Sequence, residues 1–223
     1  MLDSKVKRGI ERGRRVGTSG RGTKRALILD AARRVFEADG LDGASLRAIA
    51  TEAGYTPPAL YFHFTSKEDL YAAVLHASLE RLGAAVAEAA ATANGWPGRL
   101  HAAAMAFFGF YAQHPRDLDL GFYLLRGGMK PAGLGRARDE ALNAALADAL
   151  APIADAARAS GLSAEAAELL VVDLFAHAVG LLLLAHTGRI RMFGASAEAM
   201  MDAHVRRQIE RLRDPTETET ETA

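Results

Sequence analysis

Helical periodicity runs almost without interruption over residues 23–213, and it constrains the fold more than any other feature of the chain. Apolar residues recur three or four positions apart, as Ile28, Ala32, Val35 and Phe36 do near the start. No stretch alternates apolar and polar residues in the way that a half-buried strand does. The sequence therefore predicts an all-α protein.

Glycine, proline and cap-forming residues divide this periodic stretch into helices. The first is expected from Thr23 to Gly40, and a short second one, capped by Ser45, from Leu46 to about Ala53. A turn cluster at residues 94–97 is the main later boundary. The remaining helices are expected from residue 57, over 67–90, and over 98–113, 116–126, 136–159, 163–187 and 196–213.

Composition narrows the class of protein further. The chain has 223 residues, of which half are hydrophobic and 24% are charged, as in a soluble globular protein. It has no cysteine, which excludes disulfides and thiolate metal sites and fits a cytoplasmic location. No signal peptide is evident. The most apolar run, Leu169–Ala185, is interrupted by Asp173 and His177, so we interpret it as a buried core helix and not as a membrane span.

A net charge of zero conceals two oppositely charged ends. Residues 1–25 hold nine Lys and Arg against two acidic residues, and five glycines fall within residues 1–22. Residues 214–223 hold four acidic residues and no basic one. We expect a disordered basic arm over 1–22 and a disordered acidic tail over 214–223. Such an arm is suited to a polyanionic partner, or it is a flexible tail that aids solubility.

The stretch GYTPPALYFHF, residues 54–64, contains two consecutive prolines between two helical segments. Proline is accepted in the first turn of a helix, where backbone N–H groups have no partner in the helix. We therefore expect Pro57 and Pro58 to begin a helix, with Thr56 capping it through its hydroxyl. A helix, a short turn with glycine and a second short helix form a helix-turn-helix, whose second helix enters the DNA major groove.

The sequence resembles the tetracycline-repressor (TetR) family of bacterial transcriptional regulators. The resemblance is dense over residues 23–70, with matching order and spacing throughout. Pro58 departs from the family pattern, in which glycine or another small residue is common at this position. The matching segments are Arg25–Phe36, Gly40, Ser45–Ala50, Ala53–Thr56, Leu60–Phe64 and Ser66–Leu70.

The resemblance implies a DNA-binding domain over residues 23–70 and a helical regulatory and dimerisation domain over residues 71–213. In the first domain, Leu60 and Phe64 are four residues apart and should pack inward on Ile28, Phe36 and Ile49. Short side chains at the start of the recognition helix permit close approach to bases, and Tyr61, His63 and Lys67 are suited to phosphates. Half-buried packing is the alternative for Tyr61 and His63. The expected DNA-binding residues are Thr23, Lys24, Arg25, Ser45, Arg47, Thr56, Pro57, Pro58, Ala59, Tyr61, His63 and Lys67.

The resemblance also implies a homodimer formed by helices 163–187 and 196–213, and a small-molecule pocket inside the regulatory domain. Two recognition helices in a dimer read two half-sites of a palindromic operator. The expected regulator is a repressor that the effector releases from DNA, although the opposite polarity is also open. Aromatic residues at helical spacing are often plain core, and this remains the alternative for the candidate pocket residues, which are Met105, Phe108, Tyr111, Phe122, Tyr123, Phe175 and His177.

No enzyme motif is present. The histidines are scattered without a His-Glu-x-x-His pattern, and the chain has no P-loop, dinucleotide fingerprint or nucleophile elbow. We expect no catalytic residues, no metal and no cofactor. The alternative function is a helical interaction protein, or a small-molecule-binding protein, that does not bind specific DNA sequences; it leaves the basic arm and residues 45–67 unexplained.

Overall fold

The computed structural model describes residues 7–121 and 133–214, with side chains from Lys24 onward. Every regular element in these two ranges is helical, so the all-α prediction is confirmed. The elements are α1 (Lys7–Gly43), α2 (Leu46–Glu52), α3 (Pro57–Tyr61), α4 (Lys67–Thr92), α5 (Gly95–Gln113), α6 (Pro115–Gly121), α7 (Arg136–Arg158), α8 (Ala164–His186), the 3-10 helix η2 (Arg189–Phe193) and α9 (Ala197–Arg213).

Serine side chains set four of the helix starts. In each case the N-cap hydroxyl accepts a hydrogen bond from the backbone N–H three residues later, which satisfies a donor that the helix leaves unpaired. The four donor amides lie 3.1 to 3.3 Å from their serine hydroxyls. Helices α2 and α4 begin where the sequence predicts them, after Ser45 and Ser66, and α8 and α9 begin one residue later than predicted, after Ser163 and Ser196.

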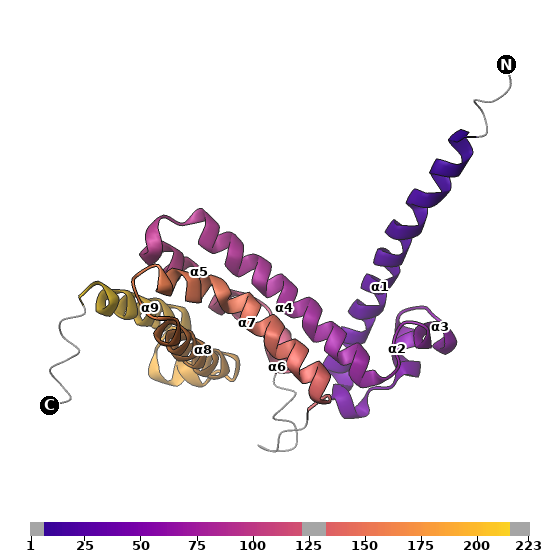
Figure 1. Ribbon diagram of the computed structural model, residues 1–223. Coiled ribbons are helices and arrows are strands. Elements are labelled where there is room, and N and C mark those ends of the chain that lie inside the picture. The colour runs from indigo at the N-terminus through magenta and orange to yellow at the C-terminus, as the bar shows by residue number, and fades with distance from the viewer. Residues whose placement is uncertain (1–6, 122–132, 215–223) are drawn as a thin grey trace.

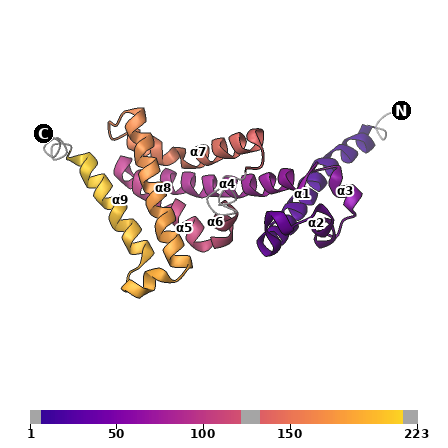
Figure 2. The ribbon, with the colours of Figure 1, turned by 90° about the horizontal axis from the view of Figure 1, so that it is seen from below.

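The helices form two adjoining parts (Figures 1 and 2). In the smaller part α1, α2 and α3 surround a core that includes Ile28, Phe36, Ile49, Leu60 and Phe64. In the larger part α4 lies against α5 and α7, with α8 and α9 packed at the far end. The predicted boundary after residue 70 falls inside α4, which extends from one part into the other.

The core of the smaller part also includes residues from later in the chain. Leu120 of α6, Leu134 just before α7 and Leu142 of α7 are buried in the same cluster as residues of α1, α2 and α3. Helix α6 contacts α1 directly, and α7 contacts α4.

Helix α1 differs from its predicted start. Residues 7–22, expected to be a disordered arm, continue the helix, which points away from the rest of the molecule (Figure 1). Glycine weakens a helix by about 1 kcal/mol per residue relative to alanine, which is why the sequence predicts no helix here. Extending a helix that already exists avoids the cost of nucleation, however. The predicted stop at Gly40 is present as a break in the helical backbone (φ 68°, ψ 178°).

Helix α8 is not the buried core helix expected from its composition. It is the one helix in the described part of the chain that is long and apolar enough to cross a membrane by length and composition, and only 22% of its most apolar window is buried. The expectation that Asp173 and His177 make it too polar for a span is therefore wrong as a matter of composition. Both residues face α9, where Asp173 accepts a hydrogen bond from His204 at 2.8 Å and the His177 ring stacks on the His204 ring.

Candidate nucleic-acid interface and effector groove

A tight turn joins α2 to α3. Gly54 adopts a left-handed conformation with φ of 70°, which residues with side chains rarely adopt. The Tyr55 amide donates a hydrogen bond to the Ala50 carbonyl at 2.8 Å, and the Gly54 amide donates one to the Thr51 carbonyl at 3.1 Å. The predicted helix stop at Gly54 and the helix-turn-helix geometry are thus confirmed.

Thr56 occupies the N-cap position of α3, but its hydroxyl does not cap the helix, contrary to the prediction. A capping hydroxyl accepts from the second or third amide of the helix. The second is Pro58, which has no N–H, and the amide of the third, Ala59, already donates to the Thr56 carbonyl at 3.0 Å. The helix therefore starts through the fixed φ of its prolines, and the exposed Thr56 hydroxyl remains available for another partner.

The two faces of the segment around α3 differ sharply. Leu60 and Phe64 are buried and pack with Ile28, Phe36 and Ile49, as predicted. The side chains of Tyr61, Phe62 and His63 are exposed, Tyr61 by 58% and Phe62 by 89%. Since α3 lies at the outer edge of the smaller part (Figures 1 and 2), these side chains are open to a large partner.

Phe62 has no role in the sequence analysis. The signal that distinguishes it is its position: it follows Tyr61 directly at the end of α3, where the inward positions are already taken by Leu60 and Phe64. A ring that is 89% exposed beside other solvent-facing residues is a candidate for contact with a nucleic acid.

Two of the predicted contact residues have partners within the protein. The Lys67 ammonium donates to the Asp42 carbonyl at 3.3 Å, and the Ser45 hydroxyl accepts the cap bond from the Ala48 amide at 3.1 Å. To contact a phosphate, each of these two side chains would have to share the hydrogen bond to its partner in the protein or give it up. Lys67 therefore fixes the start of α4 against the end of α1.

The other predicted contact residues surround the same edge. Arg25 lies 5.9 Å above the centre of the Phe64 ring, a cation–π arrangement that joins the middle of α1 to the segment just after α3. The side chain of Thr23 lies outside the described residues. Exposed side chains belong to Lys24, Arg25, Ser45, Arg47, Thr56, Pro58, Tyr61 and His63, and half-buried ones to Pro57, Ala59 and Lys67.

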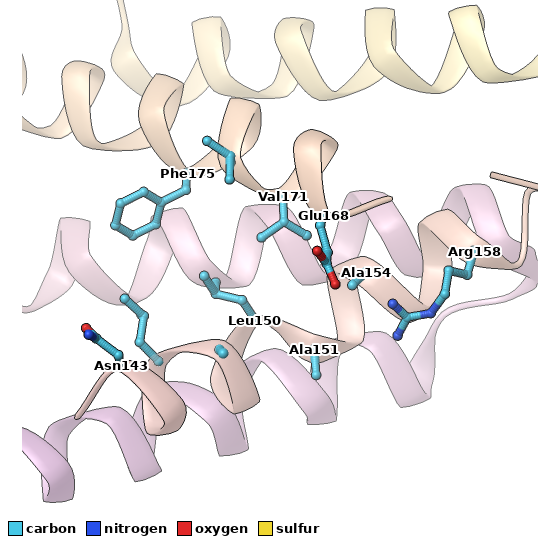
Figure 3. A pocket seen from close by; sticks show the side chains of 11 residues that line it. Asn143, Leu150, Ala151, Ala154, Arg158, Glu168, Val171 and Phe175 are labelled. Atoms are coloured by element: carbon cyan, nitrogen blue, oxygen red, sulfur yellow. The ribbon is translucent and has the colours of Figure 1, made fainter. Parts of the chain in front are cut away.

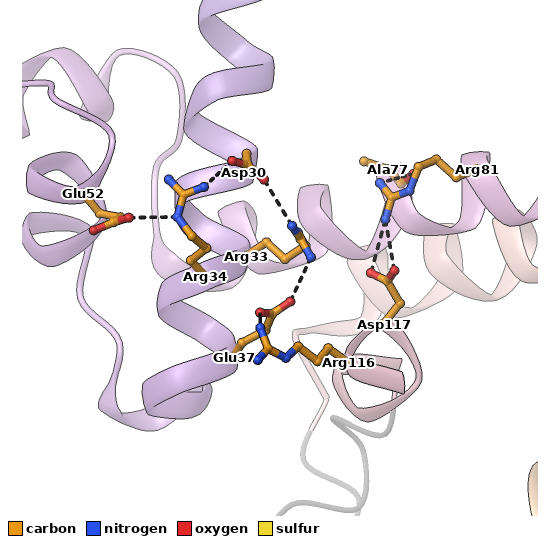
Figure 4. Close-up of polar contacts among 9 residues, drawn as sticks. All are labelled: Asp30, Arg33, Arg34, Glu37, Glu52, Ala77, Arg81, Arg116 and Asp117. Carbon is orange, nitrogen blue, oxygen red and sulfur yellow. Dashed lines mark hydrogen bonds and ion pairs between the residues drawn. The ribbon is translucent and has the colours of Figure 1, made fainter. Parts of the chain in front are cut away.

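A chain of ion pairs ties this edge to α6 of the larger part (Figure 4). Arg34 of α1 donates to Glu52 of α2 at 2.8 Å and also pairs with Asp30. On the opposite side of Asp30, Arg33 pairs with both Asp30 and Glu37. These ion pairs fix α2 on α1, and Glu37 continues the chain beyond α1.

Helix α6 completes that chain. Arg116 donates to Glu37 at 2.8 Å, and the next residue, Asp117, accepts two bonds from Arg81 of α4 at 3.2 and 3.3 Å. The Tyr71 hydroxyl donates to the carbonyl of Leu120 at 2.8 Å. Helix α6 is thus bonded both to α1 and to α4, the two helices that flank the helix-turn-helix.

A groove of about 460 Å³ lies between α7 and α8 (Figure 3). Its walls are mainly apolar; Arg158 and Glu168 lie toward one end and Asn143 toward the other. This volume is within the range of small-molecule sites, about 300–1,000 Å³. The lining residues are Asn143, Leu146, Ala147, Leu150, Ala151, Ala154, Arg158, Glu168, Val171, Val172 and Phe175.

Of the predicted pocket residues that the structure describes, Phe175 lines the groove and the others do not. Phe108 and Tyr111 are buried in the core, and Met105 packs against it. Burial raises the pKa of Tyr111 to about 12. His177 faces α9, where burial and the neighbouring His204 hold its pKa below the usual value. Phe122 and Tyr123 lie outside the described residues.

Among the described residues, no group of three or more His, Asp or Glu side chains is arranged to hold a metal ion. What the structure offers instead is an exposed recognition segment, a set of ion pairs leading from it to α6, and an apolar groove in the helical body. These features define a helix-turn-helix DNA-binding regulator with a separate helical body.

Comparison with known proteins places the chain in a family. The sequence pattern of the bacterial regulatory proteins of the tetR family matches residues 28–74. The chain is 34% identical over 174 residues to the HTH-type transcriptional activator FasR of Mycolicibacterium smegmatis, an alignment that covers 77% of this chain and 74% of FasR. The protein belongs to the TetR family of transcriptional regulators, as the sequence resemblance indicates.

Solved structures share the fold over most of the chain. A TetR-like transcriptional regulator from Rhodococcus sp. RHA1 superposes with a TM-score of 0.62 at 21% identity, covering 84% of this chain and 96% of that one. FadR from Bacillus subtilis, solved in complex with stearoyl-CoA, superposes with a TM-score of 0.63 at 16% identity over the same shares of the two chains.

Proposed function

We propose that the protein binds a palindromic DNA operator as a homodimer, represses transcription from it, and is released when a small molecule occupies the helical body. The observation that carries the proposal is the exposure of Tyr61, Phe62 and His63 on one edge, over a buried Leu60 and Phe64. Function of this kind belongs in the cytoplasm, where the DNA is, and requires no catalytic group.

An exposed apolar stripe on α8 supports the homodimer. Leu169, Val172 and Leu183 are 53 to 64% exposed, and Ala176 and Gly180 lie exposed between them at helical spacing. Apolar surface of this extent is unfavourable in water, and small residues in the centre permit a second helix to approach closely. A matching stripe on a second copy is the simplest cover for it, since isologous pairing buries the same patch twice.

The groove between α7 and α8 supports an elongated apolar effector. Its walls are apolar along their length, and Arg158 at one end is suited to an anionic head group. The stearoyl-CoA bound to the B. subtilis FadR structure is a molecule of this kind, held by a protein with the same fold. We therefore propose a long-chain acyl compound as the effector class.

The direction of regulation has two candidates. FasR, which aligns with most of the chain, is named an activator. AcnR of Corynebacterium diphtheriae, named a repressor, is 35% identical over 65 residues. Activation is therefore the second candidate, and a promoter reporter with and without the regulator gene distinguishes the two by the sign of the change.

An electrophoretic mobility shift with DNA selected from a random pool tests the main claim. We expect the selected DNA to have a palindromic consensus and to migrate as a retarded band with the protein at low salt. A Tyr61→Ala and His63→Ala double variant that stays folded should not retard it. Palmitoyl-CoA at micromolar concentration should release the DNA. A pool with no enrichment after selection would rule out sequence-specific binding.

A further inference from the structure

Opposite charges stand at the two ends of the exposed stripe of α8. Glu165 and Glu168 lie in its first turns, and Arg189 and Arg191 lie in η2, just past its last turn. All four side chains are exposed. Among the described residues, none of the four makes an ion pair or a side-chain hydrogen bond. Acidic side chains at the start of a helix and basic ones at its end interact favourably with the dipole of that helix. Here the charged side chains also lie next to the exposed apolar stripe.

Antiparallel pairing of two α8 helices matches these charges, whereas parallel pairing places like charges together. The stripe runs from Leu169 to Leu183, so its midpoint is Ala176. A two-fold axis at Ala176 sets Leu169 of one copy against Leu183 of the other. At about 1.5 Å per residue, the helix extends ~15 Å from Ala176 to His186 and ~18 Å from Ala176 back to Ala164. The η2 segment of one copy therefore reaches the first turns of α8 in the other.

Those first turns border the charged end of the groove. Glu168 lines the groove together with Arg158, and Val172 belongs both to the groove and to the stripe. Met192 and Phe193, the last residues of η2, are each 79% exposed and form no part of the core of their own chain. An apolar pair on η2 and an open end of an apolar groove would thus be brought to the same place.

We propose that η2 of each subunit closes the Arg158 end of the α7–α8 groove in the partner subunit. Met192 and Phe193 cover the apolar wall, while Arg189 and Arg191 lie beside Glu165 and Glu168. The groove is then complete only in the dimer, and the two basic side chains join Arg158 around the head group of a bound ligand. This inference rests on the proposed homodimer and deepens it, because it assigns the partner a part in the effector site.

Cysteine cross-linking tests the arrangement, because the chain has no cysteine of its own. One chain carries Phe193→Cys and a second, distinguished by a size tag, carries Glu168→Cys; the two are mixed, allowed to exchange and treated with a short bis-maleimide. We expect a cross-linked species of the summed size. The matched control uses Asn143→Cys in place of Glu168→Cys, at an exposed position at the opposite end of the same groove. It should give at least about tenfold less of the cross-linked species.

Separate variants distinguish this inference from the dimer itself. Ala176→Cys should cross-link to its own copy if the α8 stripes pair. Cross-linking at Ala176 without the Phe193–Glu168 product would overturn the closure of the groove and leave the dimer standing. A monomer in sedimentation, with neither product, would overturn both. Strong self-cross-linking of Phe193→Cys would indicate parallel helices and would also overturn the inference.

Charge reversal gives a second, independent readout. Changing Glu165 and Glu168 to Arg should raise the dimer dissociation constant at low salt by about tenfold, and changing Arg189 and Arg191 to Glu should do the same. Combining all four changes should restore dimerisation, because the pairs are then reformed with opposite sign. If the effects of the two double changes on the dimer dissociation constant simply multiplied in the fourfold variant, the pairing of these two ends would be contradicted.

Discussion

Arg116 donates a hydrogen bond to Glu37 at 2.8 Å, and this ion pair joins α6 of the larger part to α1 of the smaller part, which carries the helix-turn-helix. The two partners differ in environment: the Glu37 side chain is 7% exposed and that of Arg116 is 75% exposed. Glu37 keeps a second partner, Arg33, when Arg116 leaves. Breaking the pair therefore leaves the buried Glu37 with Arg33, whereas the equally buried Asp117 accepts both of its side-chain hydrogen bonds from Arg81.

Arg116→Ala should leave stability nearly unchanged and alter DNA binding. We expect the free energy of unfolding to fall by less than about 1 kcal/mol, because Arg116 is exposed and Glu37 keeps Arg33 as a partner. Operator affinity should fall by up to about fivefold, because the substitution removes one of the bonds that orient α1 on α6. Urea denaturation and fluorescence anisotropy with labelled operator measure the two effects.

The control for Arg116 is Arg136→Ala, which removes an exposed pair with Glu140 within α7. It should affect neither stability nor operator binding beyond experimental error. Equal operator affinity in wild type, Arg116→Ala and Arg136→Ala would show that the α6–α1 ion pair does not position the recognition helix.

Tyr61 and Phe62 should separate the contributions of hydroxyl and ring to DNA binding. Both side chains are exposed, so Tyr61→Ala and Phe62→Ala should change stability by less than about 0.5 kcal/mol. We expect Tyr61→Ala to weaken operator binding by about 1–3 kcal/mol, and Tyr61→Phe to lose most of the same amount if the hydroxyl meets a phosphate or base edge. Full affinity in Tyr61→Phe would assign the interaction to the ring instead.

Much of this architecture could be predicted from the sequence, because local signals decide it. Serine caps and glycine stops place the ends of α2, α4, α7, α8 and α9 within one or two residues of their predicted positions. The inward packing of Leu60 and Phe64 likewise follows from helical spacing within the motif. These features depend on neighbours in the sequence.

What the sequence could not predict depends on partners far apart in the chain. Arg116 and Glu37 are 79 residues apart, and Lys67 meets the Asp42 carbonyl 25 residues away. The groove is lined by residues of both α7 and α8, and of the predicted pocket residues that the structure describes, Phe175 is the one that lines it. The Thr56 hydroxyl was assigned to a cap that it does not make, because Pro58 has no N–H to donate and the Ala59 amide donates to the Thr56 carbonyl instead.

Deleting residues 1–20 should weaken operator binding in a salt-dependent way. The deletion removes six basic side chains: Lys5, Lys7, Arg8, Arg12, Arg14 and Arg15. Each phosphate that these side chains neutralise should make the negative slope of log binding constant against log salt concentration steeper by about 0.9. The truncated protein should therefore show a shallower slope. Binding measured between low and moderate salt checks the slope, and an unchanged slope would mean that the arm does not touch DNA.

His177 should make the stability of the α8–α9 pair depend on pH. Its ring stacks on that of His204 with 3.8 Å between centres, and its Nε2 is buried without a hydrogen-bond partner among the described residues. Burial and the charge of His204 lower the pKa of His177 in the folded protein. In the unfolded chain a histidine has a pKa of ~6.5. As the pH falls, His177 is therefore protonated in the unfolded state before it is protonated in the folded state, and this favours unfolding.

The contribution of the neutral His177 to the free energy of unfolding is therefore complete above pH ~6.5. It is lost as the pH falls from there toward the lower pKa of His177 in the folded protein. His177→Phe keeps a stacking ring without a titrating group, so the fall in the free energy of unfolding between pH ~7.5 and ~5 should be smaller than in wild type. His76→Gln is the control, because it removes a histidine from the exposed surface of α4 and leaves the stack of His177 on His204 in place. Urea denaturation at a series of pH values measures all three proteins. Parallel curves for wild type and His177→Phe would show that the stacked histidine remains free to take up its proton in the folded state.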